Sequence, residues 1–162
     1  MTPKFPEFPP EARVALYPGS FNPFTVGHMS VLERALPLFD HIVVAIGVNP
    51  DKPSADADCR RDLIADLVKA DPRVRVITYD CLTVEVARRV GARFIIRGVR
   101  SAADFEYEQN LAAVNRDIAG IETILLYTLP AHAPVSSSMV RELERYGVNV
   151  SCYLPSPLPS PK

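Results

Sequence analysis

Polar side chains and two glycines between positions 17 and 28 form a pattern that could bind phosphate. Ser20 and Thr25 bring hydroxyl groups, and His28 brings an imidazole that can donate a hydrogen bond. The glycines let a ligand approach the backbone closely. Further along the chain, Arg97 supplies a guanidinium group, and three consecutive serines begin at position 136. Together these groups point to an anionic ligand.

The segments on either side of this stretch predict how it is held. Residues 14–17 are typical of a strand, and the Pro-, Gly- and Asn-rich residues 18–23 are typical of a turn. The apolar residues that follow are spaced as in a helix, at Met29, Leu32, Leu36 and Phe39. The start of such a helix presents N–H groups and partial positive charge, so it can bind phosphate. An ordinary strand-to-helix connection with an incidental histidine is the alternative, because short loops of this kind are common.

Apolar runs and helical patterns alternate along the rest of the chain. Strands are expected at 41–48, 74–79, 93–97 and 123–127, and helices around 63–68, 84–90, 103–118 and 136–146. The long helix is expected to bury a stripe formed by Tyr107, Leu111, Val114 and Ile118. This alternation predicts the α/β class, with a doubly wound parallel sheet of five strands.

In such a sheet, ligands bind beyond the carboxyl ends of the strands. The chemically interesting residues follow those ends: Ser20, Lys52, Thr83, Arg97, Arg100, Ser136, Ser137 and Ser138. Each of them also has an ordinary explanation. Lys52 alone would be a solvated loop lysine, and the serines could serve only as a helix cap. The two arginines could form surface ion pairs with Asp104 or Glu108, and Thr83 could cap the helix that follows it.

The length and composition bound the architecture. A chain of 162 residues favours one domain, expected here at 13–155. Eight of the sixteen prolines lie near the two ends, so the Pro-rich segments 1–12 and 156–162 are expected to be extended, flexible tails with little to bury. A net charge of −1 argues against a nucleic acid as partner, because such a surface needs a large excess of Lys and Arg.

Several classes of protein are disfavoured by what the sequence lacks. Three widely spaced cysteines support neither a disulfide framework nor a zinc site and indicate a reducing compartment. No apolar run approaches the roughly 18 residues needed to cross a bilayer, so a cytoplasmic protein without a membrane partner is expected. The sequence also has no Gly-x-Gly, Walker A loop or Gly-x-Ser-x-Gly elbow. A Rossmann dehydrogenase, a P-loop ATPase and a serine acyltransferase are therefore disfavoured.

Several motifs together resemble those of the phosphopantetheine adenylyltransferase family, within the nucleotidyltransferases that carry a Thr-x-Gly-His signature. They are Tyr-Pro-Gly-Ser-Phe-Asn-Pro at 17–23, Thr-Val-Gly-His at 25–28, Phe-Asp-His-Ile at 39–42, Ile-Arg-Gly-Val-Arg at 96–100, Asp-Phe-Glu-Tyr-Glu at 104–108, Asn-Arg at 115–116 and Ser-Ser-Ser at 136–138. The resemblance implies a Rossmann-like nucleotidyltransferase fold. It also implies transfer of adenylyl from ATP to 4′-phosphopantetheine, giving dephospho-coenzyme A and pyrophosphate in the penultimate step of coenzyme A synthesis. It further implies that Mg²⁺ is carried by the ATP phosphates and that the protein itself has no metal site. A homohexamer and feedback inhibition by coenzyme A are also implied by the resemblance.

The same resemblance implies a role for individual residues. His28 would donate to the α-phosphate region in the transition state, and Ser20 would contact the attacking phosphate or bridge it to ATP. Lys52 would neutralise phosphate charge, Arg97 would hold the phosphate of phosphopantetheine, and Thr83 would line the pantetheine arm. ATP would be contacted by Ser20, Phe21, His28, Gly98, Val99, Arg100, Glu108, His132, Ala133, Pro134, Val135, Ser136, Ser137 and Ser138.

Departures from the family pattern leave two alternatives open. Asn22 stands where aspartate is usual, His-Ala-Pro-Val at 132–135 replaces Trp-x-x-Ile, and 54–60 lacks the usual Thr-x-x-Glu-Arg. One alternative is another small nucleotidyltransferase, such as a nicotinamide mononucleotide adenylyltransferase or a cytidylyltransferase, against which the block at 97–108 argues. The other is a non-catalytic module that senses a nucleotide or coenzyme A, which would not need a transition-state donor.

Overall fold

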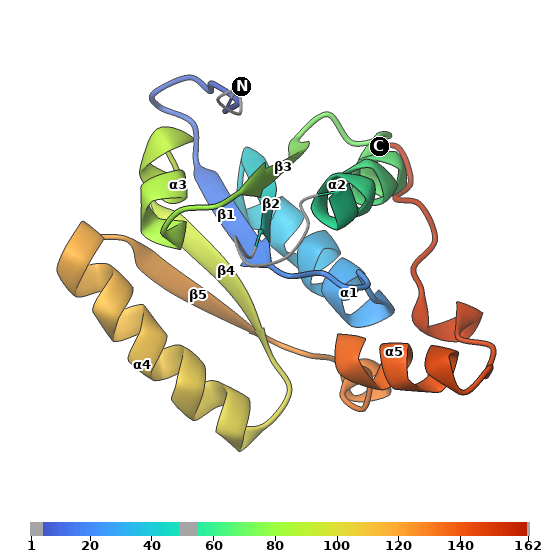
Figure 1. Cartoon of the computed structure of the whole chain (residues 1–162). Helices are drawn as coiled ribbons and strands as arrows, with labels where there is room; N and C mark the ends of the chain where they lie inside the picture. The colour runs from blue at the N-terminus through green and yellow to red at the C-terminus, as the bar shows by residue number, and fades with distance from the viewer. Residues whose placement is uncertain (1–4, 49–54, 162) are drawn as a thin grey trace.

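The computed structural model describes residues 5–48 and 55–161, which form a central sheet of five parallel strands covered by helices (Figure 1). The strands are β1 (Val14–Gly19), β2 (His41–Gly47), β3 (Val74–Tyr79), β4 (Phe94–Val99) and β5 (Glu122–Tyr127). The helices are α1 (Val26–Ala35), α2 (Ala55–Val68), α3 (Thr83–Arg89), α4 (Ala102–Ala119) and α5 (Ser137–Arg145), with short 3₁₀ turns η1 (Leu36–Leu38), η2 (Pro130–His132) and η3 (Ser151–Tyr153). The predicted α/β class and the five-stranded parallel sheet are confirmed.

The strand order is β3-β2-β1-β4-β5, so the chain winds outward from β1 in both directions. β1 pairs with β2 over six residues but with β4 over only two, both near the start of β1. The reversal of strand order between β1 and β4 is the place where open α/β sheets bind ligands. The doubly wound topology therefore directs the site to the carboxyl ends of these two strands.

Two apolar clusters cover the two faces of the sheet. Ala15 and Tyr17 of β1 belong to the cluster that contains residues of α1 and α2, whereas Val14 and Leu16 belong to the cluster that contains residues of α3. This alternation is expected for a central strand buried on both faces. Figure 1 shows α1 and α2 on one side of the sheet and α3 and α4 on the other. None of the helices in the described part of the chain is long and apolar enough to span a bilayer.

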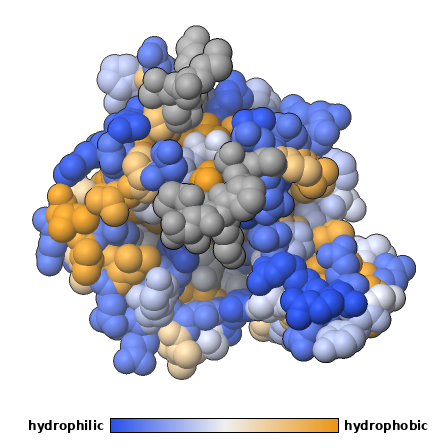
Figure 2. All heavy atoms as spheres, viewed as in Figure 1, coloured by the Kyte–Doolittle hydropathy of each residue, from blue (hydrophilic) through white to orange (hydrophobic). Residues whose placement is uncertain are grey.

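The expectation that α4 buries an apolar stripe is wrong. Its four members are largely exposed, at 64% for Tyr107, 36% for Leu111, 52% for Val114 and 54% for Ile118. The buried residues of this helix are Glu108 and Asn115. Helical spacing shows that apolar residues share a face but not which face meets the sheet; here the inward face carries polar residues. Figure 2 shows apolar side chains gathered on the surface over α4.

Described residues near both ends of the chain contact the rest of the domain. Near the N-terminus, the ring of Phe8 stacks on His41 with 4.5 Å between centroids. Residues 156–161 form no helix or strand, yet Leu158 is buried in the cluster of α1 and α2, and its N–H donates to the Leu67 carbonyl at 2.7 Å. The expectation that this segment has little to bury is therefore wrong for Leu158.

Candidate active site

Thr25 and His28 hold each other at the start of α1. The N–H of His28 donates to the Thr25 hydroxyl at 3.4 Å, and the Thr25 N–H donates to Nδ1 of His28 at 3.0 Å. This reciprocal arrangement is a capping box in which histidine takes the place that Glu or Gln usually fills. Because Nδ1 accepts a hydrogen bond, the proton of the neutral imidazole lies on Nε2. The cap thus fixes both the orientation and the tautomer of His28.

The imidazole of His28 is enclosed by aromatic rings. Phe21 meets it edge to face at a centroid distance of 5.1 Å, and Phe24 lies at 5.4 Å. Burial above all, together with the positive charges of Arg100 and Arg97, lowers the pKa of His28 to about 4. The side chain is therefore a neutral donor at physiological pH.

The loop before His28 is tightly packed. Phe21 has a φ of 45°, a conformation that L side chains rarely adopt. Its ring lies so close to Gly19 that a Cβ there would be 2.8 Å from ring carbons, so glycine is required at this position. The Tyr17 hydroxyl donates to the carbonyl of His28 at 3.3 Å, and burial raises the pKa of Tyr17, which keeps its proton.

Arg97, at the end of β4, is fixed by a buried carboxylate. Its Nη2 donates to Glu108 Oε1 at 2.6 Å, its Nε lies 2.9 Å from both carboxylate oxygens, and its Nη1 donates to the Pro18 carbonyl at 2.7 Å. The side chain of Glu108 is only 6% exposed. A carboxylate as buried as that of Glu108 needs such a partner, because leaving it charged and unpaired costs several kcal/mol. Arg97 is therefore oriented before any ligand arrives.

Arg100 is held more loosely. Its Nε and its backbone N–H each donate to Asp104 Oδ2 at 3.1 Å, and its Nη1 donates to the Val135 carbonyl at 3.4 Å. The two side chains of this pair are 40% and 31% exposed. Surface ion pairs of both arginines are one interpretation of the sequence, and both pairs are present. Arg100 pairs with Asp104 at the surface, whereas Arg97 pairs with a buried carboxylate, that of Glu108.

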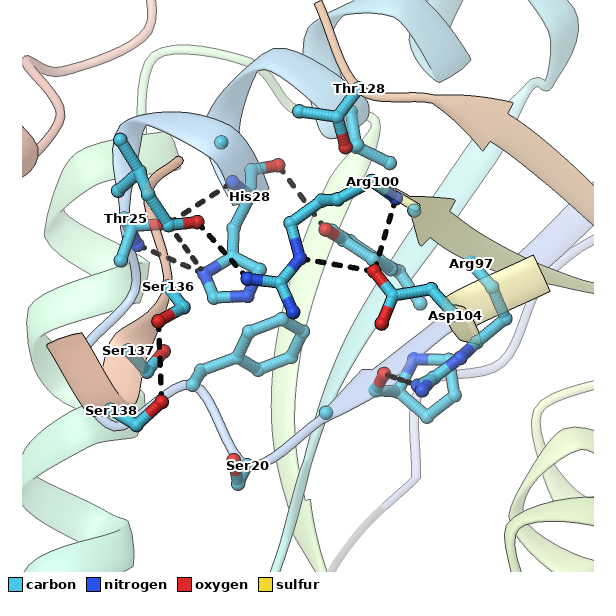
Figure 3. A pocket seen from close by; sticks show the side chains of 18 of the residues that line it. Ser20, Thr25, His28, Arg97, Arg100, Asp104, Thr128, Ser136, Ser137 and Ser138 are labelled. Carbon is cyan, nitrogen blue, oxygen red and sulfur yellow. Dashed lines mark hydrogen bonds and ion pairs between the residues drawn. The ribbon is translucent and has the colours of Figure 1, made fainter. Parts of the chain in front are cut away.

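The serine run forms the start of α5. Ser136 caps the helix by accepting from the Met139 N–H at 3.1 Å, and Ser137 donates to the Pro23 carbonyl at 2.8 Å. One turn into the helix, Arg141 donates to the carbonyl of Asn22. Figure 3 shows these serines across the cavity from Arg97 and Asp104, with His28 and Arg100 between them. The N–H groups and partial positive charge of this helix start are suited to an anion.

Two adjoining cavities collect most of the predicted residues. The larger, of about 450 Å³, is lined by Ser20, Phe21, His28, Arg97, Gly98, Arg100, Glu108, Val135, Ser136, Ser137 and Ser138, among others. The smaller, of about 280 Å³, is lined by Ser20, Thr83, Arg97 and Glu108 together with Tyr79, Ile95 and Leu111. Ser20, Arg97 and Glu108 thus form part of a wall that the two cavities share.

Some predicted residues lie elsewhere. Val99 is buried in β4, and His132, Ala133 and Pro134 are in or after η2; none of these four lines either cavity. Lys52 lies outside the described residues. The ligand contacts proposed for these five stay predictions. Thr83 is the first residue of α3 rather than its cap, which is Leu82, and its hydroxyl lies 3.0 Å from that of Tyr79.

Other residues that line the larger cavity were missed by sequence reasoning, chiefly Arg141, Thr128 and Tyr107. Arg141 had a usable signal, because it follows the serine run by one helical turn. Thr128, after β5, had none. With Arg97, Arg100 and Arg141 facing Asp104 and Glu108, the lining carries an excess of positive charge, which suits a polyphosphate.

A doubly wound sheet with an arginine-lined cavity at the ends of β1 and β4 is typical of nucleotide-binding α/β domains, and the sequence model of the Cytidylyltransferase-like family matches residues 16–143. Curated phosphopantetheine adenylyltransferases from Bacteroides thetaiotaomicron and Phocaeicola vulgatus are each 49% identical over 144 residues, covering 88% of this chain and 95% of the relative. The chain therefore belongs to the phosphopantetheine adenylyltransferase family. The solved structure of a bifunctional NMN adenylyltransferase/ADP ribose pyrophosphatase from Francisella tularensis has the same fold, with a TM-score of 0.67 and 13% identity over 88% of this chain and 45% of that one.

Proposed function

We propose that this protein transfers the adenylyl group of ATP to 4′-phosphopantetheine, giving dephospho-coenzyme A and pyrophosphate. The observation that carries the proposal is the shared wall of the two cavities. The larger cavity has the cations and helix start that a triphosphate needs, and the smaller one has the mixed polar and apolar lining that a pantetheine arm needs. Transfer between two bound substrates requires such a junction, because the reacting atoms must meet there.

The reaction needs positioning more than proton transfer. An oxygen of the phosphopantetheine phosphate forms a bond to the α-phosphorus of ATP, and the bond from that phosphorus to the bridging oxygen breaks as pyrophosphate leaves. The attacking phosphate already carries a nucleophilic oxygen, so no general base is required. Fixed donors that stabilise the extra charge in transit then supply catalysis.

His28, Ser20 and Arg97 are the residues proposed for that task. Nε2–H of His28 would donate to an oxygen on the α-phosphorus, a role supported by its fixed tautomer and its lowered pKa. Ser20 and Arg97, which line both cavities, would hold the attacking phosphate. Lys52 is proposed on the family resemblance to neutralise phosphate charge, and Thr83 to contact the pantetheine arm.

Mg²⁺ carried by the ATP phosphates fits this site better than a metal held by the protein. Among residues 5–48 and 55–161, no group of three or more His, Cys, Asp and Glu side chains is placed to hold a metal ion. The carboxylates that line the larger cavity, on Asp104 and Glu108, are bound by arginines. Mg²⁺ supplies neutralisation of phosphate charge when bound. Arg100 and Arg141 would neutralise the phosphate oxygens that remain.

Pyrophosphate release tests the proposal directly. Each mixture would contain the protein, ATP, Mg²⁺ and one acceptor, which would be 4′-phosphopantetheine, nicotinamide mononucleotide or glycerol 3-phosphate. In a parallel series, CTP would replace ATP. We expect release only with ATP and phosphopantetheine. Release with another acceptor or with CTP would identify a different nucleotidyltransferase. Tight binding of ATP or coenzyme A without release in any mixture would identify a sensing module.

We also propose that the exposed side of α4 mediates self-association, as a homohexamer by the family resemblance. Val114 and Ile118, which line neither cavity, make an apolar surface with the exposed parts of Tyr107 and Leu111, and association would remove this surface from water. Light scattering would give the mass of the wild type and of Val114→Asp, which should form a smaller species. A monomeric wild type at micromolar concentration would contradict this proposal. Inhibition by coenzyme A, whose pantetheine arm would compete for the smaller cavity, stays a prediction of the resemblance.

A further inference from the structure

Arg60 lies outside both cavities but reaches the loop between β1 and α1. Its Nη1 donates to the Ser20 carbonyl at 2.5 Å, across 40 positions of sequence. Its Nε donates to the carbonyl of Asp56 at 3.2 Å, and its Nη2 lies 3.6 Å from the Asp56 carboxylate. These contacts hold both ends of the guanidinium, and the side chain is only 16% exposed. The contact joins α2 to the loop that carries the proposed catalytic residues.

The carbonyl that Arg60 holds precedes the strained residue of the loop. Phe21, with its φ of 45°, keeps a strained conformation that persists only where the surroundings impose it. In a trans peptide the C=O and the following N–H point in opposite directions. The hydrogen bond to the Ser20 carbonyl therefore also sets the direction of the Phe21 N–H, in a segment that lines the larger cavity.

We propose that Arg60 is a positioning residue for adenylyl transfer, because it fixes the peptide between Ser20 and Phe21 at the wall where the two cavities meet. The inference rests on the function proposed above. Arg60 would touch neither substrate; it would act through the loop whose N–H and hydroxyl groups face them. Without this hydrogen bond, the peptide can rotate away from the conformation that the donors require.

The next residue of α2 provides a matched control. Arg61 has the same charge and the same helical environment, but it pairs with Asp58 at 2.7 Å and Asp62 at 2.9 Å on the exposed side of the helix. Replacing it with alanine removes one positive charge without touching the loop. Any effect found for Arg60→Ala and not for Arg61→Ala therefore belongs to the contacts of Arg60 with Ser20 and Asp56, of which only the one with Ser20 reaches the loop.

Steady-state kinetics of the full-length protein test the role. For Arg60→Ala we expect kcat to fall by about ten- to a hundredfold, the loss that a displacement of about 1 Å produces, while KM for ATP and phosphopantetheine changes by less than about threefold. Arg60→Lys should recover part of kcat, since one ammonium can reach the Ser20 carbonyl but cannot also hold Asp56. Arg61→Ala should match the wild type. A wild-type kcat in Arg60→Ala would overturn the proposal.

A measurement without substrates separates this inference from the proposed reaction. Hydrogen exchange of a peptide that covers residues 20–24 should be faster in Arg60→Ala than in the wild type and in Arg61→Ala, at equal melting temperatures. If the wild type released no pyrophosphate, the proposed function would fail while this comparison still reported on the loop. Equal exchange in all three proteins would overturn the claim that Arg60 fixes it, and so would a fall in melting temperature that accounts for the whole change.

Discussion

The floor and the rim of the active site hold their charged groups in different ways. The floor, which we define as His28, Arg97 and Glu108, consists of groups with fixed orientations: Arg97 and Glu108 are joined by hydrogen bonds of 2.6–2.9 Å, and Nδ1 of His28 accepts from the Thr25 N–H at 3.0 Å. The rim, defined as Arg100, Asp104 and the serines at 136–138, is more exposed, and its arginine makes longer contacts of 3.1–3.4 Å. The floor is therefore arranged before a ligand binds, whereas the rim can still adjust to one.

This difference separates two tasks that anion-binding groups perform. Donors that are already oriented cost no reorganisation when charge develops in the transition state, so they favour the rate. Exposed charges attract and seat a charged ligand, but the surrounding water and salt weaken them. The comparison predicts that the floor governs kcat and the stability of the fold, and that the rim governs modest changes in binding.

Replacing His28 should give the largest effect. For His28→Ala we expect kcat to fall by about a hundred- to a thousandfold, as when one donor to a developing negative charge is removed, with little change in ATP affinity. Steady-state kinetics and calorimetric titration with ATP measure the two quantities. Equal losses in affinity and rate would show that His28 only binds the ground state, and the floor would lose its distinct role.

Removing the carboxylate of Glu108 should destabilise the fold more than any change at the rim. Glu108→Ala leaves the guanidinium of Arg97 without its partner, and breaking a buried pair typically costs 3–5 kcal/mol. Because the Arg97 side chain is 27% exposed and water can reach it, we expect a loss of about 3 kcal/mol in the free energy of unfolding. Urea denaturation measures it. Arg97→Met with Glu108→Leu, which removes both charges, should recover much of that loss.

The pKa of His28 predicts a pH dependence of stability. In the unfolded chain, His28 takes up a proton near pH 6.5, but in the folded protein only near pH 4. The unfolded state therefore binds more protons between these values, and stability falls as the pH drops from 6.5 toward 4. At pH 5 this amounts to about 1–2 kcal/mol relative to pH 7.5. The difference in unfolding free energy between wild type and His28→Ala should shrink by that amount; a constant difference would contradict the lowered pKa.

Some features of the floor could be predicted from the sequence and others could not. Residues at the ends of strands were brought together as the strand-end rule predicts, because the order of parallel strands fixes which ends meet. The tautomer of His28 and the bond from Arg60 to Ser20 were not predicted, since they depend on backbone direction and on contacts between segments far apart in the chain. Both are properties of tertiary geometry rather than of pattern.

The exposed apolar stripe on α4 shows that the sequence predicted this helix but not its orientation. The helix and its bounds were predicted closely, at 103–118 against the observed Ala102–Ala119. Its orientation was not, because apolar periodicity predicts that a face will be buried without saying by what. In this helix Glu108 and Asn115 face inward. Glu108 does so because it pairs with Arg97.

The smallest effect is expected at the rim, from Asp104→Ala. This carboxylate lies three positions after the Ser101 cap and pairs with Arg100, which precedes that cap, so the ion pair is local and exposed at the start of α4. Such pairs contribute about 0–1 kcal/mol, and the favourable position near the helix N-terminus adds a few tenths. We therefore expect a loss of at most about 1 kcal/mol in urea denaturation, decreasing further in 0.5 M salt because screening weakens exposed charges. The isosteric Asp104→Asn removes the charge but keeps a side-chain oxygen that can accept from the Arg100 N–H, so it should lose less. A loss as large as that of Glu108→Ala would mean that the rim is as rigid as the floor, and the division of tasks between them would not hold.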